Sequence, residues 1–464
     1  MRWYYPLIAA LLAAFALQAG LLVMALYALV AVVWLSRYLS RTWISGIVAK
    51  RSIKISSSGD HEGLQIGEDI TIQIELMNKG KLRIGWVLVE DLLPRSALVQ
   101  RPPKLTVSRG RRIKLGSIAA GKKWDITYTV TFQARGYYQI GPSLLETGDY
   151  FGLHRRHRVV TKPIYVMVYP KVIPLPKYDF ASQRPIGEVH LANRLFEDPT
   201  RNAGVRPYQL GDPLQRIHWR ASARTGQLQS KVYDPTSLAG ASLLLDFYHE
   251  GYHDRGEPVR SELAITTASS LAYLIASLNQ QIGLMTNGQD AARRLKLNIQ
   301  IQEGDENEAG SFSNRETARS ECESTEGENQ LQPLKVETRR GGSQFQLILE
   351  VLARVEFSME FTFHQLVMEA IPHLPRDATV IAILPKVPVE TALVLGMLRR
   401  QGFAVSALLI ALDEEEYALG YGRLVAEGIR DVRAIDSLEQ LANLGEKIAH
   451  SAGPNPLQIE RALA

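Results

Sequence analysis

The stretch ASLLLDFY, residues 241–248, decides the fold of the C-terminal half of the chain. Its apolar run is unbroken from Leu243 to Leu245 and ends at Asp246. A strand that exposes one face alternates apolar and polar residues, so an unbroken run predicts a strand buried on both faces of a parallel sheet. Ligands of α/β sheets bind beyond such strand ends, which makes Asp246 a candidate site residue.

Downstream of this strand, apolar strands and helical patterns alternate. Helices are expected at 261–280, 388–401 and 415–427, and strands at 282–288, 378–384, 404–412 and 431–435. This alternation predicts a doubly wound α/β domain over residues 206–448. Residues 449–464 are expected to be a flexible tail.

Upstream, residues 51–170 alternate with period two and are punctuated by turns. In DITIQIELMNKG, residues 69–80, Ile70, Ile72, Ile74 and Leu76 share one face before Asn-Lys-Gly ends the run. Short strands at this spacing predict an antiparallel β-sandwich. Residues 171–205 are rich in proline and polar groups and are expected to be a linker.

The N-terminal segment, residues 1–50, predicts a membrane element. Residues 6–36 carry no charge and would form a helix of about 46 Å, longer than a hydrocarbon core of about 30 Å. Gln18-Ala19-Gly20 near the middle favours a transmembrane hairpin, although one tilted span stays open. The basic residues that follow the segment predict that the downstream domains lie on the cytoplasmic side of a plasma membrane; these residues are Arg37, Arg41, Lys50 and Arg51.

Composition excludes several classes of protein. Lysine and arginine total 53 against 48 acids, a net charge of +5, which is too weak for nucleic-acid binding. The single cysteine, Cys322, excludes an intrachain disulfide. Residues 303–328 carry nine acids and two bases, a net charge of −7, so a disordered acidic insertion is expected at about 303–330.

The stretch GDPLQRIHWRASARTG, residues 211–226, gathers chemically active side chains. Asp212 as N-cap and Gly226 after the end predict a helix over residues 213–225. On that helix Arg216, Arg220 and Arg224 form one stripe, which either binds an anionic partner or pins the helix to the fold. His218 and Ser222 share a face, but no acid beside them orients the imidazole as in a Ser-His hydrolase.

This stretch and its flanks resemble a bacterial family, the domain-of-unknown-function family 58 (DUF58). RGYYQIGPSLLETGDYFGL, residues 135–153, also resembles the upstream segment of these proteins. The resembling positions with an expected docking or anion-binding role are Arg206, Arg216, Arg220, Arg224 and Lys231. Those with an expected structural role are Tyr208, Gly211, Asp212, Trp219 and Ser222. The resemblance implies a von Willebrand factor A-like domain and an AAA+ ATPase of the MoxR type as partner, with no established reaction.

A metal-binding domain of that kind ends its first strand with Asp-x-Ser-x-Ser, whose oxygens hold Mg²⁺. Here Asp246 is retained, but Tyr248 and Glu250 replace the serines. Thr266 or Thr267 could add a hydroxyl, and Lys386 could neutralise Asp246. We therefore expect a degenerate site at Asp246 with no tightly bound metal and no cofactor.

Together these features predict a non-enzymatic, membrane-anchored adaptor that works with a MoxR-type ATPase in assembly or maturation of a partner. No P-loop, dinucleotide turn or nucleophile elbow supports an enzyme. The alternative is a hydrolase that uses Asp246. A third reading is a sensor of anionic lipid through the basic segment 108–114.

Overall fold

The computed structural model describes residues 20–55, 63–175, 197–208, 217–235, 240–252, 256–293, 311–312, 332–376, 378–410 and 413–443. The chain divides into two compact units, and we describe each by itself. The first unit comprises Met1–Lys171, Asp290–Gln330 and Leu349–Glu356. The second unit comprises Val172–Gln289, Leu331–Ile348 and Phe357–Ala464.

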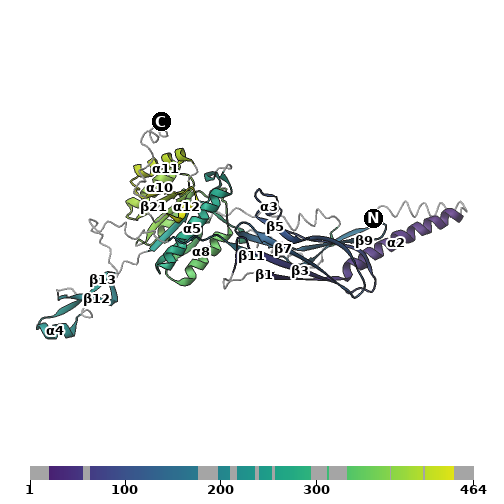
Figure 1. The fold of residues 1–464 in the computed structure, drawn as a ribbon, viewed down its shortest axis with the longest axis horizontal. Helices are drawn as coiled ribbons and strands as arrows, with labels where there is room; N and C mark the ends of the chain where they lie inside the picture. Colours follow the sequence, from purple (N-terminus) through teal and green to yellow (C-terminus); the bar gives the residue numbers. More distant parts are fainter. Residues whose placement is uncertain are drawn as a thin grey trace. The chain divides into compact units, whose positions relative to one another are not determined.

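The first unit consists mainly of β-strands (Figure 1). One sheet has the order β1-β3-β7-β5, a second β17-β10-β9-β4-β6 and a third β2-β11-β8. The elements are α2 (Gly20–Gly46), β1 (Ile47–Ile55), β2 (Leu64–Gln65), β3 (Asp69–Asn78), β4 (Ile84–Asp91), α3 (Arg95–Val99), β5 (Leu105–Gly110), β6 (Ile113–Ile118), β7 (Lys123–Phe132), β8 (Gly136–Ile140), β9 (Ser143–Gly148), β10 (Arg155–Thr161), β11 (Ile164–Tyr169) and β17 (Ser311–Phe312).

The core of the first unit is built from alternating strand residues. On β3 every second residue is buried, and Ile70, Ile72, Ile74 and Leu76 are fully enclosed. The alternation predicted for residues 69–80 is thus confirmed. These side chains join one apolar cluster with inward residues of both larger sheets, because successive side chains of a strand point to opposite faces.

The N-terminal helix corrects the predicted transmembrane hairpin, which is wrong. Residues 20–46 form one continuous helix, α2, which runs on past the end of the apolar segment at Ser36. The reason is packing: Trp43 and Ile44 are buried in the core of the first unit, so the second half of the helix lies on the sheets. Among the described residues, no helix combines the length and apolar character needed to cross a bilayer. The expected first arm of the hairpin lies outside the described residues.

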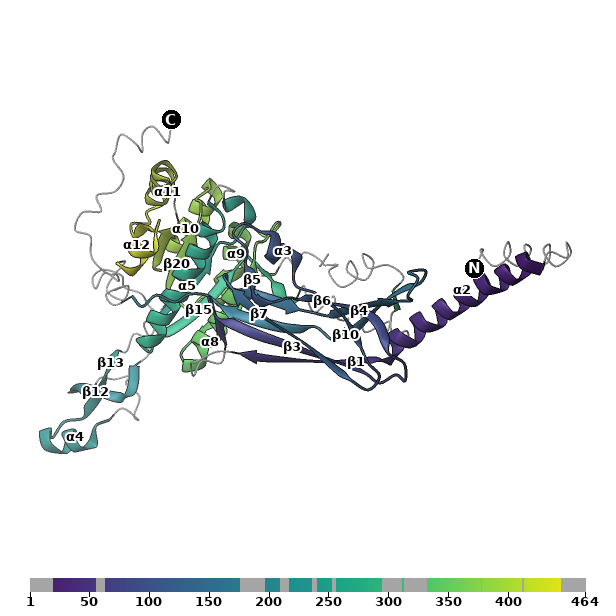
Figure 2. The same ribbon diagram turned by 45° about the vertical axis from the view of Figure 1, so that its right-hand side comes forward.

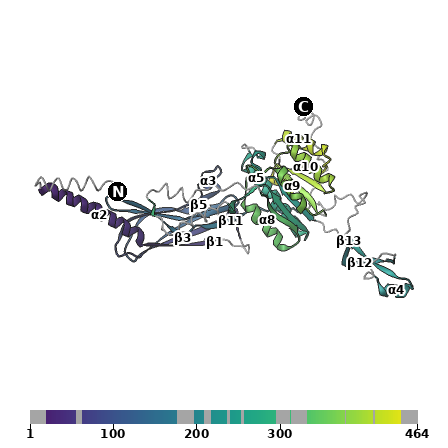
Figure 3. The same ribbon diagram turned by 180° about the vertical axis from the view of Figure 1, so that it is seen from behind.

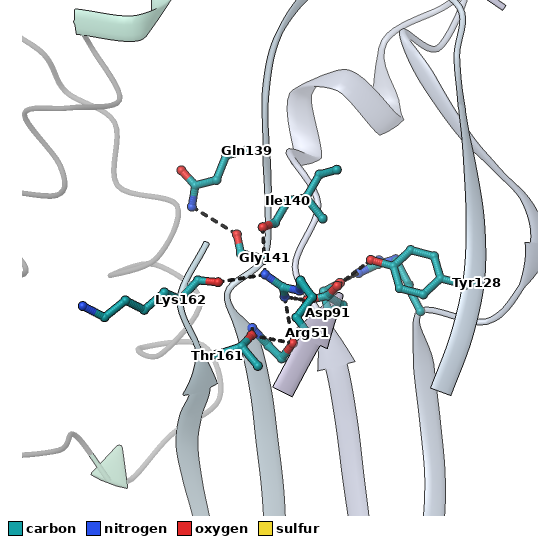
Figure 4. Close-up of polar contacts among 10 residues, drawn as sticks. Arg51, Asp91, Tyr128, Gln139, Ile140, Gly141, Thr161 and Lys162 are labelled. Atoms are coloured by element: carbon teal, nitrogen blue, oxygen red, sulfur yellow. Dashed lines mark hydrogen bonds and ion pairs between the residues drawn. The ribbon is translucent and has the colours of Figure 1, made fainter. Parts of the chain in front are cut away.

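Arg51, expected as a charge beside the membrane, is instead buried at the centre of a polar network (Figure 4). Its guanidinium forms an ion pair with Asp91 and donates to the hydroxyl of Ser143 at 2.8 Å. It also donates to the carbonyls of Ile140 and Lys162, at 3.0 and 2.9 Å. The cation is therefore surrounded by acceptors from β4, β8, β9 and the turn between β10 and β11, as a buried charge requires.

Asp91 is satisfied from the other side of the same network. The hydroxyl of Tyr128 donates to Oδ2 of Asp91 at 2.5 Å, and that of Ser143 donates to Oδ1 at 2.8 Å. Burial is the main cause that raises the pKa of Tyr128, followed by the nearby Asp91 charge. The tyrosine is thus held as a neutral donor. The segment that resembles the upstream family motif, 135–153, supplies Gly141 and Ser143 to this network.

Gly141 makes the approach of Arg51 geometrically feasible. Its φ of +84° lies in the left-handed region, and a Cβ atom there would clash with the Arg51 guanidinium. We expect Gly141→Ala to lower the free energy of unfolding by about 2 kcal/mol, from backbone strain and displacement of the arginine. Urea unfolding checks this, with Gly121→Ala as the control, because Gly121 has a similar φ of +70° and no atom near its Cβ position. Equal losses in the two variants would contradict the proposed clash.

The acidic segment at about 303–330 contains described backbone only at Ser311–Phe312. These two residues form β17, which pairs antiparallel with β10 through Phe312–His157 and Ser311–Arg158. At these positions the expected disordered loop is therefore a strand. Backbone pairing needs no apolar side chains, because the edge of β10 offers its own N–H and C=O groups.

The second unit combines one six-stranded sheet with helices. Its elements are β12 (Glu197–Pro207), α4 (Trp219–Thr225), β13 (Gln229–Pro235), β14 (Gly240–Leu245), η3 (His249–Gly251), α5 (Val259–Ser277), β15 (Gln281–Thr286), β18 (Leu334–Arg339), α8 (Gly342–Arg354), α9 (Phe363–Ala370), η5 (Ile371–His373), β20 (Thr379–Leu384), α10 (Val389–Arg400), β21 (Val405–Leu409), α11 (Glu414–Ala426), β22 (Val432–Ala434) and α12 (Leu438–Ala442). The C-terminal part of α8 belongs to the first unit, and two short strands, β16 (Gln289–Asp290) and β19 (Val355–Glu356), pair separately.

The strand order of the large sheet is β18-β15-β14-β20-β21-β22. All neighbours are parallel except β18, which runs antiparallel to β15. From β14 the chain moves to β15 on one side and later returns to β20 on the other. The order thus reverses beside β14, the place where open α/β sheets bind ligands.

Helices cover the large sheet on both faces. One apolar cluster joins Leu244 of β14 and Val380 of β20 to α9 and α10. Figure 3 labels both helices in the second unit. Leu243 and Leu245 are equally buried but point to the opposite face, where α5 lies against β14, β15 and β20. The buried strand predicted to end at Asp246 is confirmed, because β14 covers Gly240–Leu245, and the strands and helices predicted individually between residues 261 and 435 are confirmed too.

Other parts of the predicted fold are not confirmed. The structure does not establish the von Willebrand factor A-like assignment, and the antiparallel β18 departs from a purely parallel sheet. β12 begins at Glu197, inside the segment 171–205 that was expected to be a linker. It does so because its backbone pairs antiparallel with β13.

Candidate functional site

The arginine-rich stretch forms a shorter helix than predicted. α4 begins at Trp219, and the helix predicted over residues 213–225 is therefore wrong at its start. The imidazole of His218 caps it by accepting from the N–H of Ala221 at 3.1 Å, in place of the predicted cap Asp212. Gly226 ends the helix in the left-handed conformation, with φ of 69°, as predicted.

Long-range pairing explains the late start of α4. Ile217 forms an antiparallel bridge with Ser230, and the N–H of His218 donates to the carbonyl of Gln229 at 2.8 Å. Ile217 is also buried, so Ile217 and His218 are held in an extended, paired segment and the helix can begin only after them. Gly211, Asp212 and Arg216 lie outside the described residues.

The remaining arginines of the stripe are accessible. Arg220 and Arg224 lie one turn apart on α4 and are exposed, and neither forms an ion pair among the described residues. Trp219 beside them is 70% exposed. Figure 2 shows α4 next to the two-stranded sheet of β12 and β13. We call the exposed side of α4 with these three side chains the α4 surface.

The two-stranded sheet of β12 and β13 holds the other predicted docking residues. Arg206 on β12 pairs with Ser230 on β13, and Lys231 pairs with Val205. Arg206 and Lys231 are half-buried, so they are less accessible than the α4 arginines. The structure thus brings them to one two-stranded sheet beside α4 but not into the exposed stripe.

Ser222 and Tyr208, two residues with an expected structural role, form hydrogen bonds with the segments on either side of α4. The Ser222 hydroxyl donates to the carbonyl of His218 at 3.1 Å and accepts from the N–H of Gln229 at 2.9 Å. The N–H of Tyr208 donates to the carbonyl of Leu228 at 2.8 Å. Because Ser222 contacts the backbone of His218 and not its imidazole, no Ser-His pair is formed.

Asp246 lies directly after β14, where the strand order of the large sheet reverses. Its Oδ1 accepts from the side-chain amide of Asn287 at 2.9 Å and from the N–H of Tyr248 at 3.2 Å. Asn287 is itself fixed, since its Oδ1 accepts from the N–H of Phe247 at 2.6 Å and its amide donates to Phe361. The carboxyl group is therefore held rigidly at the carboxyl edge of the sheet.

Aromatic rings pack beside the backbone of Asp246. Phe247 stacks on Phe357 at 4.5 Å between ring centroids, and Tyr252 packs against both rings. The Tyr252 hydroxyl donates to the carbonyl of Asp246 at 2.8 Å. Burial raises the pKa of Asp246 to about 6, although the hydrogen bonds from Asn287 and Tyr248 act in the opposite direction. The group can thus exchange a proton near neutral pH.

The environment of Asp246 offers few metal ligands. No group of three or more His, Cys, Asp or Glu side chains suited to a metal ion occurs among the described residues. The hydroxyl of Thr267 donates to the carbonyl of Leu263 within α5, at 2.8 Å. None of the described ion pairs joins Lys386 to Asp246, and hydrogen bonds alone offset the burial of this carboxyl. The degenerate metal site remains a prediction.

A buried arginine occupies the neighbouring strand ends. Arg260 of α5 is 1% exposed and donates through Nε to the carbonyl of Ile410 at 2.7 Å. Its Nη2 donates to the carbonyl of Pro385 and pairs with Glu416 at 2.9 Å. Pro385 and Ile410 directly follow β20 and β21. The protein's own cation thus fills the edge of the sheet next to Asp246.

Sequence analysis missed both Asn287 and Arg260. A signal for Asn287 existed, because it follows the strand of residues 281–286 and so belongs to the same sheet edge as Asp246. Arg260 gave no such signal, since an arginine in the first turn of a helix is ordinarily solvated. Its acceptors lie 125 and 150 residues further along the chain.

Comparison with known sequences gives a partial match to the predicted family. Residues 204–321 match the family described as protein of unknown function DUF58. The chain is 24% identical over 264 residues to the uncharacterized protein YeaD of Bacillus subtilis (strain 168), over 55% of this chain. The chain spans 60% of the length of that relative.

Similarity to solved structures is slight. The FixG-related protein from Vibrio parahaemolyticus aligns with 26% of this chain and 95% of its own, at 8% identity and a TM-score of 0.16. Proximal thread matrix protein 1 of the mussel byssus aligns with 45% of each chain, at 10% identity and a TM-score of 0.28. Scores this low carry no argument about fold. The similarity to DUF58 therefore rests on residues 204–321, a stretch that contains both α4 and Asp246.

Proposed function

We propose that this protein is a non-enzymatic adaptor at the bacterial plasma membrane, with its folded units in the cytoplasm, that docks a protein partner through the α4 surface. The observation that carries this proposal is the exposure of Trp219, Arg220 and Arg224 within the part of the chain that matches DUF58. Tryptophan and arginine are the residue types that most often dominate binding energy at interfaces.

The chemistry of the α4 surface specifies the partner surface. Each guanidinium can form a bidentate contact with a carboxylate, and the indole of Trp219 needs an apolar pocket. An acidic surface with an adjoining apolar pocket therefore fits best. The resemblance to the DUF58 family makes an AAA+ ATPase of the MoxR type the candidate partner, in assembly or maturation of a further protein.

We expect the double variant Arg220→Glu/Arg224→Glu to bind this ATPase at least about tenfold more weakly, because two attractive contacts become repulsive. Titration of the purified full chain with the ATPase from the same organism measures the change. The matched control is Arg293→Glu/Arg430→Glu, which makes the same charge change at two other exposed arginines. Undiminished binding by the folded α4 variant, or equal weakening by the control, would refute docking through α4.

The raised pKa of Asp246 favours a second candidate function, a hydrolase that uses this carboxyl as acid or base. A general acid or base with a pKa of about 6 is well matched to neutral pH. Against this function, one oxygen of the carboxyl is already engaged by Asn287 and Tyr248. A hydrolytic activity of the full chain that disappears in Asp246→Asn, with partner binding intact, would favour the enzyme over the adaptor.

A further inference from the structure

A short turn of the first unit exposes three large apolar side chains. It connects β9 to β10, and Tyr150, Phe151 and Leu153 in it are 65%, 62% and 55% exposed. Isolated exposed apolar residues are common, but three within four positions form a contiguous apolar patch, and such patches are typical of interaction sites. We call residues 150–153 the β9–β10 turn.

The β9–β10 turn is held rigidly from within. Oδ2 of Asp149 accepts from the N–H of Phe151 at 2.9 Å, and Oδ1 accepts from the N–H of His154 at 2.7 Å. Burial acts to raise the pKa of Asp149, but these backbone donors hold it below its ordinary value. The aspartate therefore stays ionised and keeps the apolar side chains directed outward.

The turn is also fixed to α2. The Ser36 hydroxyl and Nδ1 of His154 lie 2.8 Å apart and share a hydrogen bond. The ring of Tyr150 packs edge-on against Trp43, with 5.1 Å between centroids. Trp43 is itself buried in the core of the first unit. The turn thus lies alongside the helix, between the levels of Ser36 and Trp43.

Next to this level, α2 exposes a long apolar and aromatic surface. Trp34 and Tyr38 stack with 5.6 Å between centroids, and both are exposed. Further exposed large apolar residues of α2 are Leu21, Met24, Tyr27, Leu29 and Leu35. Tryptophan and tyrosine concentrate where a bilayer meets water, because their rings have an apolar body and a polar edge.

Three arginines gather at the same level. Arg37 and Arg41 belong to α2, and Arg156 belongs to β10, just beyond the turn. Burial lowers the pKa of Arg156 below its ordinary value, and the positive charges of Arg41 and Arg37 lower it further. Positive charges thus concentrate at this level of the first unit, and an anionic surface would attract them.

We propose that the β9–β10 turn inserts into the headgroup interface of an anionic lipid bilayer beside α2, as a second membrane contact of the chain. This inference rests on the proposed membrane location and adds to it a specific element and lipid class. Phe151 and Leu153 enter the apolar boundary, Tyr150 stays at its edge, and the arginines face the lipid phosphates.

The arginines favour a lipid surface over a second copy of this chain. An apolar patch that pairs with itself would bring two copies of Arg37, Arg41 and Arg156 together, at a cost in repulsion. A bilayer containing phosphatidylglycerol instead offers both an apolar layer and negative charge at the same boundary.

The test uses the purified full chain and flotation with vesicles of phosphatidylcholine, with or without phosphatidylglycerol. We expect Phe151→Ser/Leu153→Ser to weaken partition into the anionic vesicles at least about tenfold, since the two apolar side chains that enter the bilayer are lost. Tyr150 is left intact because it packs on Trp43. The control is Val99→Ser/Leu115→Ser, which changes two apolar residues that are exposed elsewhere in the first unit.

A second measurement reports insertion directly. An environment-sensitive fluorophore at Phe151→Cys, in a Cys322→Ser background that removes the only native cysteine, is expected to move to an apolar environment when anionic vesicles are added. If the full chain floats but the turn variant floats equally and the fluorophore is unchanged, this inference fails while the membrane location stands.

Two further outcomes are informative. If the full chain does not float with either vesicle type, the proposed membrane location fails, and this inference fails with it. If the fluorophore moves to an apolar environment without vesicles, and does so in proportion to protein concentration, the β9–β10 turn pairs two copies of the chain. A lipid contact is then ruled out.

Discussion

Replacement of Asp91 by asparagine is expected to lower the free energy of unfolding of the first unit by about 3–5 kcal/mol. The reason is the burial of its partner: Arg51 is 2% exposed in its side chain and would lose the only carboxylate that the described structure places on it. A guanidinium cannot neutralise itself by losing a proton, so the uncompensated charge must be borne by the fold. Tyr128 would lose a charged acceptor at the same time.

Urea unfolding followed by tryptophan fluorescence measures this loss. Of the described tryptophans only Trp219 belongs to the second unit, so the signal comes mainly from the first. The control is the double variant Arg51→Met/Asp91→Leu, which removes both charges and should lose less stability than Asp91→Asn alone. A loss below about 1 kcal/mol in Asp91→Asn would show that Arg51 does not need its partner.

Regular elements were predictable because their signal is local. The alternation of Ile70, Ile72 and Ile74 placed β3, and the unbroken run at Leu243–Leu245 placed β14. The parallel strands of the large sheet are buried on both faces, so their composition alone distinguishes them from the alternating strands of the first unit. Such patterns depend only on which face of an element is buried.

Errors arose where a distant residue decides the conformation. Arg51 resembles a charge beside a membrane segment until Asp91, forty positions later, folds onto it. Ile217 fits a helix until its backbone pairs with Ser230. The continuous helix α2 likewise depends on the burial of Trp43 in a core that sequence patterns do not reveal. In each case a tertiary contact outweighs the local preference.

The candidate site at the sheet edge was predictable in position but not in detail. A polar residue directly after a buried strand identified Asp246 from sequence. The partners of this carboxyl come from other strand ends, and no local pattern specifies that Asn287 reaches it. The same holds for Arg260, whose acceptors follow β20 and β21.

Asp246→Asn is expected to stabilise the second unit at pH 8 by about 3 kcal/mol relative to the wild type. The folded-state pKa of about 6 exceeds the ordinary value of 3.8 by about two units, each worth about 1.4 kcal/mol. Because the folded-state pKa is raised, the stability contributed by protonated Asp246 is fully present below pH 3.8. It is lost as the pH rises through about 6. Asparagine never ionises and avoids this loss.

The difference between wild type and variant must therefore grow with pH between about 4 and 7 and level off above that range. Chemical denaturation followed by far-ultraviolet circular dichroism measures it, since the second unit holds most of the described helices. Glu369→Gln, at an exposed carboxyl, is the control and should show no such slope. A difference that is constant with pH would mean that Asp246 ionises normally. A rising difference would show that the fold retains a destabilising carboxyl at the edge of its sheet, which is the behaviour expected of a group kept for function and not for stability.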